Sequence, residues 1–571
     1  MAGGLLNLIA IGNQNVIING NPTKTFWKST YKRYTNFGLQ NFSLNFEGQK
    51  SLQLSNETTF TFPVNRYADL LRGCYLVFSI PDIYSPAIYD SSLSKRLINC
   101  NEISKWIPYE FKWIENLGAM IISNIRVLVG GALIQEISGY DIVAFANRDL
   151  SATEKKKWDQ MTGNIPELYD PANVFNRNNN YPTATYQDDG AQPSILGREI
   201  YVPLPFWWGN TDQQAFPLVA LQYSELTIEI TTRPIQELFK IRDISDGPEY
   251  PYKAPNFIDS TQQFYIFLQT PPPPDPTGQL NYQNKNATWN GNIYLSANYC
   301  FLSEEERTLF ATKEQNYLVK QIYDTWYLGI PMNGNLDLDN CTGLVTSFMF
   351  LFSRSDVKNR NEWTNFTNWP YLNHEPYPIK PAMLECPGEY SSSDQYFNDG
   401  NIRALSIIPR DNGTINYPMY STGPYKEENK KEILTELGIS FDASIRETPA
   451  PFGIYKYVQP YLSSSGFAAS TLDGLYCYNF CLDTSPFKLQ PSGAVNLSKF
   501  TQITLNFVTT TPTINPSSSF NIICDPDSGN QIGVVKSPNS IYNYDYNLLV
   551  IEERFNVISF ISGNAGLMLA R

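Results

Sequence analysis

The sequence has little of the side-chain chemistry that enzymes use most. It contains one histidine, His374, and no H-E-x-x-H, G-x-S-x-G, P-loop or G-x-G-x-x-G motif. A His-rich zinc site is excluded, and a serine or cysteine hydrolase would have to use His374, which we interpret as a surface-loop residue. The acidic pairs Asp337/Asp339 and Asp525/Asp527 have a spacing that calcium sites and glycosidases use, but loop carboxylates of this kind are common. We therefore predict no enzyme activity, no metal site and no cofactor.

Charge is also scarce. Lys, Arg, Asp and Glu make up 17 % of the chain, against ~25 % in ordinary soluble domains, and the formal net charge is −13. A protein that coats nucleic acid needs a basic face to neutralise phosphates, whereas the longest basic run here is Lys155–Lys157, which is typical of a solvated helix turn. We predict no direct contact with nucleic acid.

Long apolar runs and paired cysteines are missing as well. The longest apolar stretch, Leu344 to Phe352, is about half of the ~20 residues that a transmembrane helix needs. The opening MAGGLLNLIAIGNQN lacks the basic region of a signal peptide, and Asn7 interrupts its apolar stretch, so we interpret residues 1–26 as an arm that docks on a partner. The eight cysteines include no C-x-x-C pair, which indicates reduced thiols in a protein made in a cytosol.

Aromatic residues and proline replace the missing charge. The chain has 37 Tyr and 39 Pro; Tyr suits half-buried pleated surfaces, and Pro separates short elements. Apolar and polar residues alternate in six segments, as the two faces of an antiparallel strand require. These segments are Phe42–Phe46, Phe60–Phe62, Leu76–Ile80, Ile125–Val129, Leu226–Ile230 and Ile503–Phe507. The pattern predicts an all-β sandwich protein.

The length predicts two domains, because 571 residues are too many for one core. The clearest break lies between Pro234 and Thr288, where Pro271–Pro274 cannot belong to a central strand. In this interpretation the strand ending at Ile230 closes the first unit, and strands resume at Asn292. We predict a first domain over residues 27–234, a Pro-rich linker over 235–290 and a second domain over 291–571.

Helices are predicted to be few and short. Ser151 with Glu154 and Ser303 with Glu306 have capping-box spacing, and a third candidate helix runs from Lys426 to Leu437. Three segments exceed ordinary connection lengths and are expected to gather at one end of the sandwiches. They cover residues 81–118, 163–197 and 353–399.

Four segments carry a more specific pattern. Residues 20–28 read GNPTKTFWK and lead to YKRYTNF at 31–37, and residues 302–322 read LSEEERTLFATKEQNYLVKQI. Residues 474–480 read GLYCYNF and continue to QPSGAVNLSKF at 490–500, and residues 561–567 read ISGNAGL. In this order the four segments resemble the major capsid proteins of nucleocytoplasmic large DNA viruses. The strand at 347–352 departs from that pattern, since it lacks the Trp and Gln found there.

The resemblance implies two tandem eight-stranded jelly rolls, a double jelly roll. It also implies a homotrimer of pseudo-hexagonal outline that tiles an icosahedral virion shell, with long loops outward and its base over an inner viral membrane. Neighbouring capsomers, minor capsid proteins and penton proteins would be its partners, and assembly would occur in the host cytoplasm. A basic and aromatic segment suits a contact on the inner face, and its residues are Trp27, Lys28, Tyr31, Lys32 and Arg33.

Two other readings stay open. A minor capsid or spike protein of the same virus class would form a single jelly roll or an oligomer that does not tile. A carbohydrate-binding β-sandwich protein would be a monomer with an aromatic cleft. Among the Asn-x-Ser/Thr sequons, Asn286, Asn365 and Asn412 are candidate sites for virus-directed glycosylation of loops.

Overall fold

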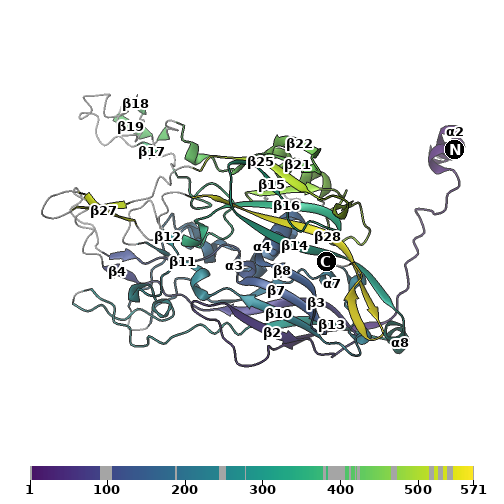
Figure 1. The fold of residues 1–571 in the computed structure, drawn as a ribbon, viewed down its shortest axis with the longest axis horizontal. Coiled ribbons are helices and arrows are strands. Elements are labelled where there is room, and N and C mark those ends of the chain that lie inside the picture. The colour runs from purple at the N-terminus through teal and green to yellow at the C-terminus, as the bar shows by residue number, and fades with distance from the viewer. Residues whose placement is uncertain are drawn as a thin grey trace.

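The computed structural model describes most of the chain. The described residues are 3–89, 106–186, 190–243, 252–276, 278–376, 381–382, 406–410, 413–417, 419–420, 425–464, 472–512, 520–524, 531–536 and 544–569. They form two β sandwiches that lie one above the other in Figure 1, with an N-terminal arm that projects away from both.

The first domain contains two four-stranded antiparallel sheets. The order of one sheet is β1 (Phe37–Leu44), β13 (Tyr294–Leu302), β3 (Leu70–Ile80) and β9 (Arg198–Pro203). The order of the other is β2 (Thr58–Pro63), β10 (Leu226–Thr232), β7 (Ile122–Val129) and β8 (Ala132–Ser138).

The second domain repeats this arrangement. One sheet has the order β14 (Gln315–Ile330), β28 (Tyr546–Ile561), β16 (Leu344–Arg354) and β23 (Leu475–Asn479). To it are added β24 (Val495–Asn496), which pairs with β16, and β29 (Asn564–Leu567), which pairs with β28. The other sheet has the order β15 (Asn333–Asp337), β25 (Ile503–Thr509), β21 (Leu434–Phe441) and β22 (Ser444–Pro451).

Both domains therefore have the same topology. When the eight sandwich strands of each domain are counted along the chain, strands 1-8-3-6 form one sheet and strands 2-7-4-5 form the other. This is the strand order of a jelly roll. The predicted fold, two tandem eight-stranded jelly rolls, is confirmed, and all six segments of alternating residues contribute to sandwich strands.

The predicted domain boundary at residue 291 is wrong for one strand. β13 was assigned to the second domain, but it pairs with β1 and β3 of the first domain and is its eighth strand. β10, which is predicted to close the first unit, is its seventh strand. Alternation shows that a segment is a strand, but not which sheet it joins, and the Pro-rich break is an insertion between strands 7 and 8 rather than a linker between domains. That insertion also contains β11 (Phe239–Arg242) and β12 (Tyr252–Lys253).

Helices decorate the sandwiches. α5 (Ala152–Thr162) begins at Ser151 with the predicted capping box, in which the Ser151 amide donates to Glu154 Oε2 at 3.0 Å. α8 (Glu304–Thr312) follows Ser303 as predicted, but the Ser303 side chain accepts no capping hydrogen bond. The predicted helix from Lys426 to Leu437 is wrong. Glu427–Asn429 form only a short 3-10 turn. From Leu434 onward the segment is β21, whose apolar side chains enter the core of the second domain.

The remaining elements are short. The other α-helices are α1 (Gly3–Ile9), α2 (Asn13–Asn19), α3 (Leu117–Met120), α4 (Gly139–Arg148), α6 (Pro166–Tyr169), α7 (Trp207–Asn210) and α10 (Gln459–Ser463), which follows a π-helical turn, η10 (Ile454–Val458). β6 (Phe111–Trp113) pairs with β11. Small two-stranded sheets are formed by β4 (Ala87–Tyr89) with β5 (Trp106–Pro108), β17 (Pro381–Ala382) with β20 (Met419–Tyr420), β18 (Ser406–Arg410) with β19 (Gly413–Tyr417), and β26 (Phe520–Cys524) with β27 (Gln531–Lys536).

The long connections leave the sandwiches at one end. Because neighbouring strands are antiparallel, the links after strands 3, 5 and 7 all start at the same end of a jelly roll. Figure 1 shows the described parts of these links, β4, β11 and β12, on the opposite side from the N-terminal arm and α8. We call the two sides the loop end and the arm end. Residues 90–105, 187–189, 377–380 and 383–399 of the three predicted long loops lie outside the described residues.

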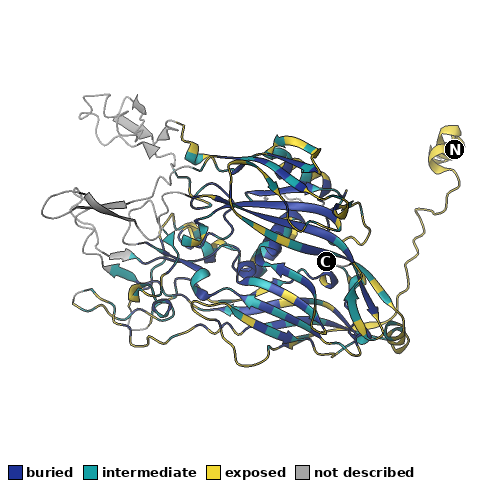
Figure 2. Cartoon of the chain, viewed as in Figure 1, coloured by how far each residue is buried: buried dark blue, intermediate teal, exposed yellow. Residues whose placement is uncertain are grey.

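β16 explains the longest apolar stretch of the sequence. Ten of its eleven residues are buried, on both faces of the sheet. Phe348, Phe350 and Phe352 pack into the core of the second jelly roll, and Met349 and Leu351 belong to the core that fills the first. One sheet of the second domain thus packs against the first domain, and Figure 2 shows the continuous buried layer between the sandwiches. Burial on both faces replaces alternation with a continuous apolar run.

Candidate assembly surfaces and the domain junction

A buried ion-pair cluster joins the two jelly rolls. Arg148, the last residue of α4, lies 2.9 and 3.0 Å from the two carboxylate oxygens of Glu553 on β28. The same guanidinium contacts Asp149 at 2.7 and 3.0 Å and donates to Ser347 Oγ on β16 at 3.1 Å. Both partners of the interdomain pair are 1 % exposed. Such bidentate, charge-assisted bonds hold a fixed geometry.

The carboxylates of this cluster respond differently to burial. Burial is the largest influence on Glu553 and disfavours its charge, but Arg148 and then Lys320 outweigh burial and lower the pKa of Glu553. Burial raises the pKa of Asp149, because there it outweighs the same arginine. The arginine thus favours the ionised form of Glu553 more strongly than that of Asp149.

Polar contacts lock the domains together at two further places. Asn361 Nδ2 of the second domain donates to the carbonyl oxygens of Gln236 and Phe239, both at 2.7 Å, and Trp363 Nε1 donates to the Glu237 carbonyl at 2.9 Å. At the arm end, the Tyr223 amide donates to the Gly563 carbonyl at 3.1 Å. The two jelly rolls form one unit with a fixed relative orientation.

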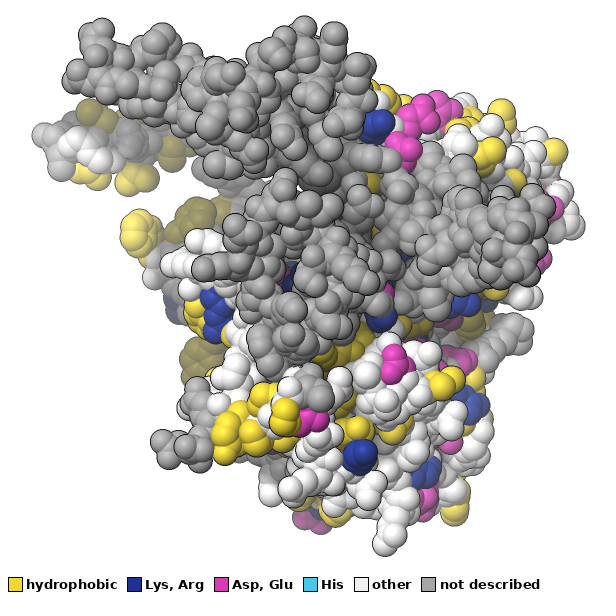
Figure 3. All heavy atoms as spheres, turned by 90° about the vertical axis from the view of Figure 1, so that its left-hand side faces the viewer, with side chains coloured by type: hydrophobic (Ala, Val, Ile, Leu, Met, Phe, Trp, Pro, Cys, Tyr) yellow, Lys and Arg dark blue, Asp and Glu magenta, His cyan; other side chains and the backbone are white. Residues whose placement is uncertain are grey.

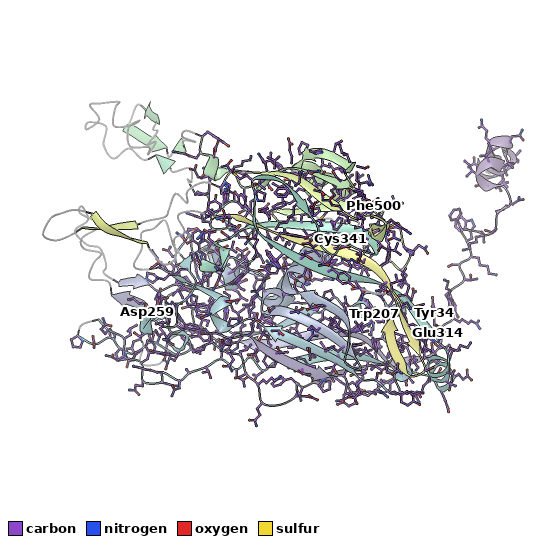
Figure 4. The ribbon with its side chains drawn as sticks, in the orientation of Figure 1. Tyr34, Trp207, Asp259, Glu314, Cys341 and Phe500 are labelled. Carbon is purple, nitrogen blue, oxygen red and sulfur yellow. The ribbon has the colours of Figure 1, made fainter. Side chains whose placement is uncertain are left out.

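A cavity of about 270 Å³ remains in this junction. Aromatic side chains from both domains contribute to its wall, among them Trp207, Phe487 and Phe555. Figure 4 places Trp207 toward the arm end, together with Tyr34 and Glu314, whereas Asp259 lies at the loop end and Cys341 and Phe500 lie in the second domain. The cavity is therefore part of the junction on the side from which the arm leaves.

The N-terminal arm is the most exposed apolar part of the described chain. Every described residue before β1 is classed as exposed, and Figure 2 shows both helices of the arm in the colour of exposed residues. Ile17 and Ile18 of α2 are 85 % and 84 % exposed. Large exposed apolar areas mark sites of interaction with proteins or membranes. The arm, predicted to end at residue 26, continues without regular structure to residue 36.

The predicted inner-face residues lie on this continuation. Trp27 and Tyr31 are 94 % and 83 % exposed, and Lys28, Lys32 and Arg33 are exposed beside them. The arm first contacts the jelly rolls just after these residues, where Thr35 Oγ1 donates a hydrogen bond to Glu306 Oε2 of α8 at 2.8 Å. The structure thus brings the five residues together on one segment that presents them to solvent.

A second exposed apolar surface lies on the second domain, and the sequence analysis did not identify it. Tyr461 and Leu462 of α10 and Leu482 of the next loop are 68–82 % exposed. The Thr484 amide donates to the Ser463 carbonyl at 2.8 Å and holds the loop against the helix. We call these three side chains the α10 patch. Its residues are about 20 positions apart in the sequence, so only the fold brings the two segments together.

The loop end has a mixed surface. Figure 3 looks onto this end, and among its described residues hydrophobic side chains alternate with uncharged polar, acidic and basic ones. Of the candidate glycosylation sites, Asn286 is exposed. The prediction of glycosylation at Asn365 is wrong, because this residue is only 1 % exposed. Its Oδ1 accepts a hydrogen bond from Thr367, the hydroxyl residue of its own sequon. Asn412 lies outside the described residues.

Candidate catalytic groups are not assembled into a site in the described part of the chain. His374 is exposed, as predicted for a surface-loop residue, and lies near Tyr371; partial desolvation lowers its pKa. Within the described ranges no three His, Cys, Asp or Glu side chains form a cluster that could hold a metal. Among the described residues, five cysteines are free thiols, Cys74, Cys300, Cys341, Cys477 and Cys481. No helix in these ranges is both long and apolar enough to cross a membrane.

Comparison with known proteins agrees with the architecture. The family model described as "Major capsid protein N-terminus" matches residues 25–303, and the one described as "Large eukaryotic DNA virus major capsid protein" matches residues 306–566. The first match ends one residue after β13, the eighth strand of the first jelly roll. The two ranges together span nearly the whole chain.

Individual relatives carry the same name. The major capsid protein of Paramecium bursaria Chlorella virus 1 is 24 % identical over 572 residues, covering 100 % of both chains. That of Phaeocystis pouchetii virus is 24 % identical and covers 90 % of this chain and 94 % of the relative. That of Chrysochromulina ericina virus is 28 % identical over 57 % of this chain, and the match spans only 53 % of that longer relative.

Solved structures show the same fold. The VP54 protein of PBCV-1 superposes with a TM-score of 0.57 at 18 % identity, covering 96 % of this chain and 100 % of that one. The Faustovirus major capsid protein gives 0.56 at 12 % identity, covering 98 % of each chain. The protein is a double jelly-roll capsid protein. It belongs to the major capsid protein family of the nucleocytoplasmic large DNA viruses, and its role is structural.

Proposed function

We propose that three copies of the chain form a homotrimeric capsomer that tiles an icosahedral shell. The observation that carries this proposal is the repetition of one strand order, 1-8-3-6 and 2-7-4-5, in two jelly rolls of a single chain. Three chains around a threefold axis then present six similar sandwiches, which give a pseudo-hexagonal outline suited to lattice packing. The locked domain junction supports this role, because a tile needs subunits of constant shape.

The two ends of the molecule support an orientation in the shell. The loop end faces outward in this proposal and carries the towers, with Asn286 as its glycosylation site. The arm end faces inward, where Trp27, Lys28, Tyr31, Lys32 and Arg33 contact the layer beneath the shell. Neighbouring capsomers, minor capsid proteins and penton proteins are the protein partners, an inner viral membrane lies below, and the genome is not contacted directly.

Assembly in the host cytoplasm and the lack of a catalytic role complete the proposal. The five free thiols support synthesis in a reducing compartment, where disulfides rarely persist. The α10 patch supports self-association, since exposed apolar patches of this kind are usually covered by a partner.

Light scattering of the purified chain tests the proposal. The expected result is a stable particle of three times the 64.9 kDa chain mass without any added cofactor. A monomer at micromolar concentration would contradict the trimer, and a stable dimer would contradict the threefold arrangement.

A further inference from the structure

The charge of the arm differs from that of the rest of the chain. The first 46 residues contain no Asp or Glu and four basic residues, Lys24, Lys28, Lys32 and Arg33. Their net charge of +4 leaves −17 for the remainder of a chain whose total is −13. A short basic segment on an acidic protein is an electrostatic footprint for an anionic partner.

Both helices of the arm carry apolar side chains that are exposed. In α1, Leu5, Leu6, Leu8 and Ile9 are all exposed, and in α2 the consecutive residues Val16–Ile18 are 60–85 % exposed. In α1, Leu5, Leu8 and Ile9 lie three and four positions apart and therefore share one face of the helix. An exposed apolar face on a short helix suits the boundary of the acyl region of a bilayer.

Aromatic residues follow the apolar helices and alternate with the basic ones. Phe26, Trp27, Tyr31 and Tyr34 are 80–105 % exposed. Trp and Tyr favour the boundary between lipid and water, and Lys and Arg near that boundary are attracted to anionic headgroups. Each helix has seven residues, far fewer than the ~20 that cross a bilayer, so an arm of this kind lies within one interface.

We propose that residues 3–34 are an anchor for a membrane surface that contains anionic lipids. The apolar side chains of α1 and α2 enter the boundary of the acyl region, and the basic and aromatic residues 24–34 contact the headgroups. The inference rests on the proposed function, which places the arm on the inner side of the shell, and it adds the chemistry of the partner that the arm meets on that side. Nucleic acid fits the arm less well, because the apolar side chains of α1 and α2 make no favourable contact with phosphate groups.

Vesicle flotation with the purified full-length protein tests the anchor. Vesicles of phosphatidylcholine with phosphatidylserine should bind the protein, and vesicles of phosphatidylcholine alone should bind it more weakly. The double variant Lys28→Gln/Lys32→Gln should lose affinity for the anionic vesicles by roughly 30-fold, since each cation near such a surface contributes about fivefold in affinity. Ile17→Ser/Ile18→Ser should lower binding to both vesicle types.

The matched control is Lys156→Gln/Lys157→Gln, which removes two exposed lysines of α5 from the body and should bind like wild type. The anchor is overturned if wild type does not float with anionic vesicles, or if both arm variants float as wild type does. It is also overturned if the wild-type protein binds duplex DNA but not vesicles and Lys28→Gln/Lys32→Gln loses that DNA binding. This result would assign the arm to nucleic acid. Light scattering of the same samples reports the trimer separately, so failure of the anchor and failure of the capsomer are distinguishable.

Discussion

Arg148 and Glu553 form a bidentate ion pair across 405 residues of sequence and join the two jelly rolls in their buried interface. Removing one partner of a buried pair leaves the other charge uncompensated. Glu553→Gln should therefore lower the free energy of unfolding by about 3–5 kcal/mol, measured by urea denaturation. Glu229→Gln is the control, because its pair with Arg126 is partly exposed, and it should cost less than about 1 kcal/mol. Equal effects of the two variants would show that the junction does not depend on this pair.

A second prediction concerns pH and a carboxyl pair at the same junction. Asp141, at the start of α4, is buried. Its burial and then the charge of Asp324 on β14 raise the pKa of Asp141 well above its ordinary value. Burial also raises the pKa of Asp324. When a carboxyl group has a higher pKa in the folded state than in the unfolded state, folding favours its protonated form. Its contribution to the free energy of unfolding is fully present below the unfolded-state pKa, ~3.9, and is lost as the pH rises toward the folded-state pKa. Asp141→Asn should therefore flatten the decline in melting temperature with rising pH. An unchanged pH profile in this variant would rule out Asp141 as its source.

The third prediction tests a close approach in one of the segments that carry the family resemblance. Gly474 has φ +81°, and a Cβ atom there would lie 2.0 Å from the Phe366 carbonyl oxygen. Gly474→Ala combines left-handed strain with a backbone clash and should destabilise by about 3 kcal/mol. Gly131 has φ +83° with open space around it, so Gly131→Ala isolates the strain and should cost about 1 kcal/mol. Thermal unfolding of both variants measures the difference, and similar losses would show that the clash is relieved.

The sequence predicts the strands better than their partners. Alternation located strands such as β10 and β25, because a half-buried strand shows its period directly. It could not show that β13 returns to the first sheet across a long insertion, since that pairing depends on contacts between residues more than 200 positions apart. β16 shows the opposite case, because burial on both faces removes the period and leaves an apolar run.

The candidate surfaces were predictable only in part. The basic and aromatic residues around Trp27 are contiguous in sequence and lie in a segment that carries the family resemblance, so the sequence shows them as one group. The α10 patch combines residues about 20 positions apart in two elements, and only folding places Tyr461 near Leu482. The sequon at Asn365 was misleading, because a sequence motif does not report that the amide is buried within its own turn.

The α10 patch gives the fourth prediction. Replacing Tyr461 and Leu482 with serine removes two exposed apolar side chains, and the fold should keep its melting temperature because neither is buried. Self-association should weaken at least ~10-fold, as is usual when anchoring apolar residues of an interface are truncated. Sedimentation velocity over a concentration series measures this, with Tyr425→Ser as a control at another exposed position. Wild-type association in the double variant would exclude the patch from subunit contacts.

Electron-microscopic imaging of single particles of the purified protein tests the capsomer most directly. Class averages viewed along the particle axis should show threefold symmetry with six similar lobes, one for each jelly roll of three chains. Averages with two lobes, or with lobes in an arrangement that lacks threefold symmetry, would contradict the proposed tile even if the fold of each chain were unchanged.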